Sequence, residues 1–223
     1  MHNDKKEPRL LVISDIHGHT DGLDFLLREA GYRSSVDRLI LLGDYIDSDP
    51  QTFSTLLTVK KLVDEGACAV PGNQETALMR AVDLRKHVMS IEVMEWLRGL
   101  PLYIEEDNYI FVHAGIRPGV PMLHQSAMDL TEIREEFWSE TEKKLNHTVI
   151  FGHTPTFKLG AARGELWFGD NRIGIDTGAK HGCRLTLYNV YEEITYSCST
   201  SSSNMYSDFR VEKMYGARKK EMT

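Results

Sequence analysis

Residues 10–18 read Leu-Leu-Val-Ile-Ser-Asp-Ile-His-Gly, four apolar residues followed at once by polar side chains. A short apolar run with β-branched members predicts a strand that is buried on both faces. Asp15 and His17 stand just past the carboxyl end of this strand. Ligands of open α/β sheets collect outside that end, so the stretch predicts a sheet and marks the place of a site.

Apolar runs alternate with helical patterns in the first third of the chain. Further strands are predicted at residues 39–42 and 67–70, with amphipathic helices around residues 23–30 and 56–63. Such alternation indicates a largely parallel sheet with right-handed crossovers.

Short strands dominate the second half. The pattern predicts a hairpin from residues 102–104 and 109–113, a helix over 129–137 capped by Asp129, and strands at 148–151, 173–176 and 185–190. The sequence therefore predicts an α/β sandwich of two sheets rather than one doubly wound sheet.

We expect one domain over residues 1–196 and a polar, basic carboxyl-terminal tail over residues 197–223. After Tyr196 the composition shifts to Ser, Thr and Asn and then to basic residues, which favours a mobile or loosely docked segment. Residues 1–9 lack the apolar run of a secretory signal, and no apolar run approaches the ~20 residues that span a bilayer.

Charge and cysteine usage restrict the partners and the compartment. The formal net charge of -7 argues against a surface that coats nucleic acid, because such surfaces are normally basic. Cys68, Cys183 and Cys198 match neither a zinc knuckle nor a disulfide framework. Reduced thiols are typical of the cytoplasm, where we expect the protein to reside without a membrane partner.

Polar residues also end or follow four of the later predicted strands. Asp44 comes behind Gly43, Asn73 follows Pro71-Gly72, and His113 and His153 end or follow later strands. Each one alone is more typical of a turn, but their succession after strands indicates a metal site. Together with Asp15 and His17 they form a set of oxygen and imidazole ligands that suits Mn, Fe or Zn better than Ca or Mg. A catalytic ion keeps one position open for water, so six ligands indicate two ions ~4 Å apart.

The ordered motifs resemble those of a known family. They are Ser14-Asp15-Ile16-His17-Gly18, Gly43-Asp44-Tyr45-Ile46-Asp47, Gly72-Asn73-Gln74-Glu75, His113-Ala114-Gly115 and Gly152-His153-Thr154. The set resembles the calcineurin-like metallophosphoesterases, in particular the phosphoprotein phosphatase branch with its bacterial serine/threonine phosphatases and symmetrical diadenosine tetraphosphate hydrolases. The resemblance extends from about Leu10 to Val190.

The resemblance implies a four-layer sandwich in which helices flank two mixed β-sheets. It assigns one divalent ion, most often Mn, to Asp15, His17 and Asp44, and a second to Asn73, His113 and His153 with Asp44 as the bridge. It also implies direct attack on phosphorus by a metal-bridging hydroxide, without a phosphoenzyme.

Two departures from the family pattern concern the substrate. Asp47 is followed by Ser48-Asp49 where protein phosphatases carry a phosphate-gripping Arg, and Gln74 replaces the His that usually acts as general acid. Arg134 lies in a motif that contributes a phosphate-contacting Arg in relatives, although an exposed residue paired with a nearby Glu remains the alternative.

The candidate site residues therefore extend beyond the metal ligands. We expect Asp47, Gln74 and Arg134 in the catalytic set, and Arg134, Arg117 and Asn73 in substrate binding. For Arg117, a turn residue before Pro118 is an equally good interpretation.

Three functions are compatible with these residues. The primary hypothesis is hydrolysis of phosphomonoesters, as in bacterial serine/threonine protein phosphatases. The alternative is a dinucleoside polyphosphate hydrolase, whose phosphate leaving group needs no protonation. A weakly active phosphate-binding module is the third. The expected partners are accordingly a phosphorylated protein or a nucleotide or other small-molecule phosphate.

Overall fold

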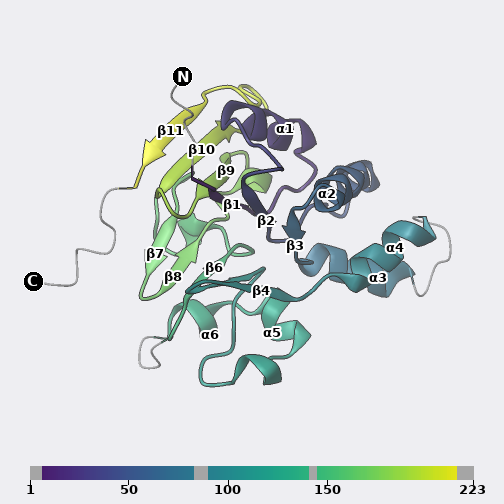
Figure 1. Ribbon diagram of the computed structural model, residues 1–223, viewed down its shortest axis with the longest axis vertical. Coiled ribbons are helices and arrows are strands. Elements are labelled where there is room, and N and C mark those ends of the chain that lie inside the picture. Colours follow the sequence, from purple (N-terminus) through teal and green to yellow (C-terminus); the bar gives the residue numbers. More distant parts are fainter. Residues whose placement is uncertain (1–6, 83–89, 141–144, 215–223) are drawn as a thin grey trace, which may run out of the picture.

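The computed structural model describes residues 7–82, 90–140 and 145–214, and two β-sheets form its centre (Figure 1). The first sheet has six strands in the order β11-β10-β9-β1-β2-β3. Its parallel part is β1 to β3, and β9 to β11 join antiparallel, so the sheet is mixed. The strands are β1 (Leu10–Ile13), β2 (Arg38–Leu41), β3 (Cys68–Ala69), β9 (Arg184–Asn189), β10 (Ile194–Ser199) and β11 (Arg210–Lys213).

The second sheet has five strands in the order β4-β5-β6-β8-β7. Three central strands are parallel, and an antiparallel strand closes each edge. The strands are β4 (Tyr103–Glu106), β5 (Tyr109–Val112), β6 (Thr148–Phe151), β7 (Trp167–Gly169) and β8 (Arg172–Gly174). The predicted hairpin is confirmed as β4 and β5, whereas β7 was not predicted because three residues leave almost no periodicity to detect.

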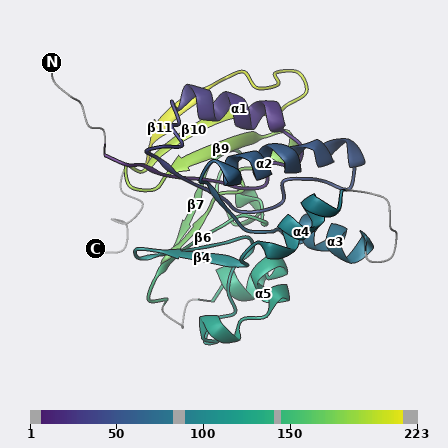
Figure 2. The same cartoon turned by 45° about the vertical axis from the view of Figure 1, so that its right-hand side comes forward.

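Helices flank both sheets. In Figure 1, α1 and α2 lie beside the first sheet and α5 and α6 beside the second, while α3 and α4 stand at one side in Figures 1 and 2. The α-helices are α1 (Thr20–Glu29), α2 (Thr55–Asp64), α3 (Asn73–Val82), α4 (Ile91–Gly99), α5 (Ala127–Glu132) and α6 (Glu135–Trp138). The 3-10 helices are η1 (Pro50–Ser54), η2 (Met122–His124), η3 (Thr156–Lys158) and η4 (Ala179–His181). None of the helices in the described ranges is long and apolar enough to cross a bilayer.

Three apolar cores separate the four layers. Successive residues of a strand point to opposite faces, so Leu11 and Ile13 pack with the helices of the first sheet, whereas Leu10 and Val12 face the second sheet. The third core lies between the far face of the second sheet and α5 and α6, where Phe137 is fully buried. Since the order is helix, sheet, sheet, helix, the predicted four-layer sandwich is confirmed.

The predicted helix over residues 129–137 is wrong in its cap and its length. Ser126 caps α5, with its hydroxyl accepting from the Asp129 backbone N–H at 3.0 Å. Asp129 lies inside α5 and its carboxylate binds Arg117 and the Ser126 hydroxyl. Extended backbone at Ile133 then ends the helix before α6 begins.

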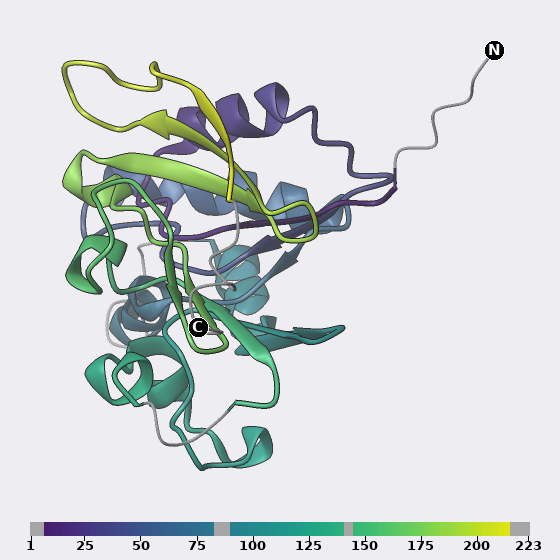
Figure 3. The same ribbon diagram turned by 90° about the vertical axis from the view of Figure 1, so that its left-hand side faces the viewer.

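The segment predicted as a tail, residues 197–223, begins inside the first sheet rather than after it. The 196/197 boundary falls within β10, which pairs with β9 over six positions, and β11 follows as the edge strand (Figure 3). The reason is the buried guanidinium of Arg184, which donates to the Ser197 hydroxyl at 2.9 Å and to the Asp208 carboxylate at 2.8 Å. Polar side chains that we expected to be exposed to solvent, because of the polar composition of this segment, are therefore hydrogen-bonded within the fold. Residues 215–223 of the predicted tail lie outside the described residues.

Candidate metal centre

Side chains from both sheets converge at the carboxyl ends of the parallel strands. The first sheet supplies residues that follow β1, β2 and β3, and the second supplies residues that follow β5 and β6. The converging side chains are those of Asp15, His17, Asp44, Asn73, His113 and His153. All six residues predicted as metal ligands are thus brought together.

Asp15, His17 and Asp44 form the first group of donors. The His17 Nε2 atom lies 3.7 Å from Asp15 Oδ1 and 3.7 Å from Asp44 Oδ2. On the other side of the ring, Nδ1 lies 3.1 Å from the Ile46 carbonyl oxygen. Donation of the Nδ1 proton to this carbonyl leaves the Nε2 lone pair directed at the carboxylates, which is the tautomer that a metal ligand needs.

Asp44, Asn73, His113 and His153 form the second group. Asn73 Oδ1 lies 3.1 Å from His113 Nε2 and 2.8 Å from His153 Nδ1, and His113 Nε2 lies 3.4 Å from Asp44 Oδ1. His113 Nδ1 contacts the Leu42 carbonyl oxygen at 2.7 Å, so its Nε2 is also oriented as a lone-pair donor.

The spacing of these atoms fits divalent ions. Donors about 2.1 Å from an ion are roughly 3–3.4 Å apart around a tetrahedral or octahedral site. The second group, at 2.8 to 3.4 Å, is close to this range, the first is slightly wider at 3.7 Å, and Asp44 is common to both. Two ions that share the Asp44 carboxylate would use the whole donor set, and its oxygen and imidazole composition suits Mn, Fe or Zn.

The backbone is strained where the ligands are presented. Asp15, His17, Asp44 and His153 all have left-handed backbones, with φ of 53°, 46°, 51° and 63°. Residues with a Cβ adopt this region at a cost of about 1–2 kcal/mol each, so the surrounding structure must hold them there. Sharp turns directly after the strands aim the side chains at one another instead of along the sheet.

Two glycines let the ligand loops touch. A Cβ on Gly72 would collide with the Asp44 carboxylate, and a Cβ on Gly152 would collide with Ser14 and the Asp15 carboxylate. The Gly152 position matters because it joins the two sheets: the following N–H, that of His153, donates to Asp15 Oδ2 at 2.9 Å. The glycines quoted in the motifs therefore have a packing role.

Burial and ion pairing act on the pKa values of the ligands. Burial lowers the pKa of His17, but the hydrogen bond and charge of Asp15 outweigh it and raise the pKa to about 9. Burial raises the pKa of Asp15, yet the His17 hydrogen bond outweighs it and lowers the pKa to about 2. Burial also raises the pKa of Asp44. Buried carboxylates this close together favour a cation between them.

Glu75 organises the loop that carries Asp44. Its Oε2 accepts from the backbone N–H groups of Asp44 and Gly72, both at 2.8 Å, and its Oε1 accepts from Tyr45 and Ile46 at 2.9 and 3.2 Å. The side chain is fully buried, and burial followed by the nearby charge of Asp44 raises its pKa to about 7. The sequence showed Glu75 in a motif but gave it no role; its place three residues past Gly72, at the start of α3, was the available signal.

Asp176 is a second buried carboxylate that sequence reasoning left without a role. It follows β8, at the same edge of the second sheet as His153, and accepts from the Gly178 N–H at 3.0 Å. Burial and then the charge of Asp15 raise its pKa well above the ordinary value. A residue that follows a parallel strand was the signal here as well.

The departures from the family pattern lie beside the ligands. The Gln74 backbone N–H donates to Asp44 Oδ1 at 2.9 Å. Asp47 forms an ion pair with Lys180 at 2.8 Å, which holds the pKa of Asp47 below its usual value despite burial. Lys180 was absent from the sequence predictions because 133 residues separate it from Asp47.

The two candidate phosphate-binding arginines differ. Arg134 is exposed beside His153: its Nη1 lies 3.4 Å from the Thr154 hydroxyl, and after burial and His113 its charge helps to lower the pKa of His153 to about 3. Arg117 instead forms an ion pair with Asp129 at 2.6 Å. Of these two arginines, Arg134 is therefore the one that contacts a neighbour of a candidate ligand, since Thr154 directly follows His153.

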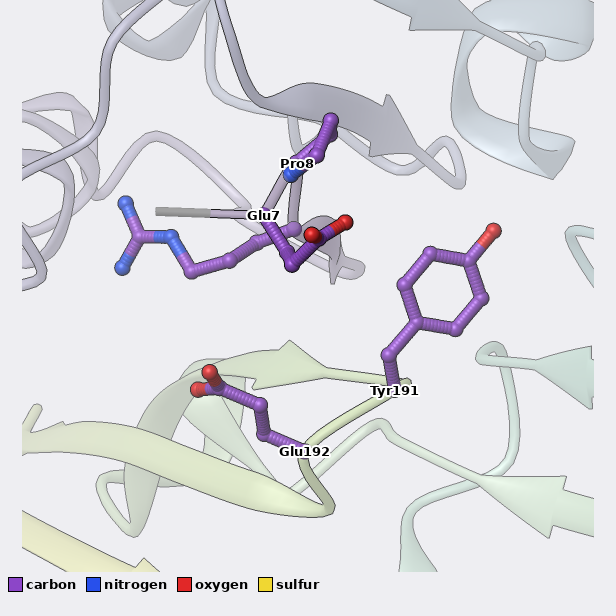
Figure 4. Close-up of a pocket in the computed structure, with 5 residues that line it drawn as sticks. Glu7, Pro8, Tyr191 and Glu192 are labelled. Carbon is purple, nitrogen blue, oxygen red and sulfur yellow. The ribbon is translucent and has the colours of Figure 1, made fainter. Parts of the chain in front are cut away.

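A separate cavity of about 390 Å³ lies at the far end of β1 (Figure 4). Glu7, Pro8, Arg9, Tyr191 and Glu192 line it, and these residues precede β1 or follow β9. Since Asp15 follows the opposite end of β1, this cavity is remote from the ligands. Its two glutamates also make it unsuited to phosphate.

Comparison with known proteins gives a consistent family. A model of the calcineurin-like phosphoesterase family matches residues 8–187. A symmetrical bis(5'-nucleosyl)-tetraphosphatase of Neisseria meningitidis serogroup A is 31% identical, across 82% of this chain and 93% of that protein. The enzyme of the same name from Vibrio campbellii is 33% identical across 48% of this chain, and here the chain spans 44% of the relative's length.

Solved structures agree with the fold. The crystal structure of a candidate diadenosine tetraphosphatase superposes with a TM-score of 0.69 at 25% identity, covering 89% of this chain and 96% of that one. A metallophosphoesterase from Sphaerobacter thermophilus superposes with a TM-score of 0.56 at 18% identity, over 88% of this chain and 89% of that one. At this identity the likeness concerns only the fold.

Proposed function

The chain belongs to the calcineurin-like phosphoesterase family, and from this we propose that it hydrolyses the phosphoanhydride chain of a dinucleoside tetraphosphate at its centre. Water adds its oxygen to one inner phosphorus, the bridging oxygen departs with the other half, and two nucleoside diphosphates result. The names of the relatives support this alternative over the serine/threonine phosphatase hypothesis.

The observation that carries the proposal is Gln74 beside the ligands. Its amide can donate a hydrogen bond but cannot release a proton at useful pH. Asp47, which in relatives accompanies the His that acts as general acid, here forms an ion pair with Lys180. When phosphoserine is hydrolysed, the leaving group is the serine alkoxide, which is basic and needs a proton. When an anhydride is hydrolysed, the leaving group is a phosphate, which departs without one. A site without a general acid at this position thus favours an anhydride.

The proposed roles of the other residues follow from their geometry. Asp15, His17 and Asp44 would hold one divalent ion, and Asp44, Asn73, His113 and His153 the other, most often Mn, with Fe or Zn as alternatives. Such ions polarise phosphoryl oxygens and lower the pKa of bound water. Arg134, whose guanidinium offers parallel donors, would bind a phosphoryl oxygen of the substrate.

A substrate panel tests the proposal. Metal-loaded protein is assayed with diadenosine tetraphosphate, a phosphoserine peptide and nitrophenyl phosphate, and the nucleotide products are separated by chromatography. We expect the highest kcat/KM for the tetraphosphate and ADP as its sole nucleotide product. A higher kcat/KM for the peptide, or release of ATP and AMP, would overturn the proposal. Chelator treatment and Asp44→Asn serve as controls, because both should abolish turnover of all three compounds.

A further inference from the structure

A group of basic side chains borders the metal centre on η3, η4 and the loop between η3 and β7. Lys158, Arg163, Lys180 and His181 are all exposed there. The chain as a whole carries a formal charge of -7, so this concentration of basic groups runs against the composition of the chain. We call these four residues the basic cluster.

Chain connections fix the basic cluster next to the ligands. Lys158 lies five residues past His153, and Lys180 lies four past Asp176. The Lys180 ammonium donates to Asp47 Oδ1 at 2.8 Å. Ile46, the residue before Asp47, supplies the carbonyl that orients the His17 ring. His181 directly follows Lys180 in η4, so it lies on the same short helix as the contact with Asp47.

Phe157 holds two members of the basic cluster in place. The Arg163 guanidinium carbon lies 4.7 Å from the centre of the Phe157 ring, and the His181 ring packs edge-on at 5.5 Å between centroids. Arg163 also donates to the Cys183 sulfur at 3.4 Å. Side chains already ordered in this way lose less entropy when they bind a ligand.

Two members of the basic cluster, Lys158 and Arg163, carry positive charge that no ion pair neutralises in the described part of the chain. Among the residues that the structure describes, neither Lys158 nor Arg163 has a carboxylate within ion-pair distance, whereas Arg9, Arg38 and Arg117 each do. Cations that are held near a site without counter-ions attract anions to it.

We propose that the basic cluster is a second phosphate subsite, which binds the phosphates of the substrate that lie beyond the bond being cleaved. This inference rests on the proposed function, because a dinucleoside tetraphosphate has such phosphates and a phosphomonoester has none. The subsite would thereby select polyphosphate substrates over simple esters.

The test compares ADP with orthophosphate as probes of metal-loaded protein, with the divalent metal kept in excess. Calorimetry gives the Kd of each probe for wild type and for the double variant Lys158→Ala, Arg163→Ala. Two lost charge-assisted contacts should raise the Kd of ADP by ~10-fold or more, and the Kd of orthophosphate, which needs only the metal centre, by less than about twofold. Lys61→Ala, Arg210→Ala removes two exposed cations elsewhere and should change neither value.

The outcomes separate the subsite from the proposed function. An equal Kd of ADP in wild type and double variant would overturn the subsite, even if the tetraphosphate is hydrolysed. A selective loss of ADP binding supports the subsite even if the tetraphosphate is not hydrolysed, which would then count against the proposed function alone. A parallel loss of orthophosphate binding would overturn the subsite as well, since the cluster would then act on the metal centre itself.

Discussion

Glu75→Gln keeps the shape of the side chain but turns one acceptor oxygen into a donor. Each oxygen accepts two backbone N–H groups, so two donors lose their partner whichever way the amide is placed. The pair from Tyr45 and Ile46 has the longer bonds, at 2.9 and 3.2 Å, and is the one expected to be lost. A buried N–H without a partner costs about 1–3 kcal/mol, so two of them would cost about 2–6 kcal/mol. Because the Ile46 bond is already long, we expect a total of ~2–4 kcal/mol.

Two measurements check this reasoning. Urea unfolding of chelator-treated protein gives the free energy of unfolding, and equilibrium dialysis gives the affinity for Mn. We expect the lower stability together with a ~10- to 100-fold loss of metal affinity, because Glu75 fixes the backbone that presents Asp44. Glu95→Gln, an exposed glutamate on α4, is the matched control and should stay within about 0.5 kcal/mol of wild type. A Glu75→Gln variant as stable as this control, with unchanged metal affinity, would refute the argument.

Three further predictions concern the phosphate contact, the leaving group and the fold. Arg134→Ala should raise the inhibition constant of orthophosphate by ~10-fold while metal content by elemental analysis is unchanged; an unaltered constant would make it a surface residue. Gln74→His should raise kcat/KM for a phosphoserine peptide relative to nitrophenyl phosphate by at least ~10-fold, and an unchanged ratio would show that protonation does not limit turnover. Asp37→Asn should cost ~3 kcal/mol in urea unfolding at pH 7, because Asp37 is buried and pairs with Arg9 at 2.7 Å. Burial raises the pKa of Asp37, but hydrogen bonds from Arg9 and Arg33 outweigh it and lower the pKa, so the difference from the variant should be full above pH ~4 and shrink below it; a difference that persists at low pH would contradict the assignment.

The sequence predicted where the candidate ligands lie, because each comes shortly after, or at the end of, an apolar run that forms a single strand. Asp15, Asp44 and His153 needed no knowledge of distant residues, since strand ends and neighbouring glycines are local signals. The pairing of Asp47 with Lys180 has no local signal, because only the folded chain brings η4 to the loop after β2. The extra strands β10 and β11 escaped for a related reason: Arg184 lies outside the tail, and its bonds to Ser197 and Asp208 exist only once β9 and β10 pair.

The candidate ligands come from two different sheets, and this has a consequence for how the protein unfolds. Asp15 of the first sheet and His153 of the second are 138 positions apart in the chain and meet at the centre. Divalent ions bound there would act as a reversible cross-link that closes a very long loop, and their binding free energy would add to the free energy of folding. Stabilisation of this kind grows with the logarithm of free metal concentration. In metal-replete protein the two sheets should therefore come apart in one cooperative step, whereas chelation should weaken their coupling and speed hydrogen exchange in both β1 and β6.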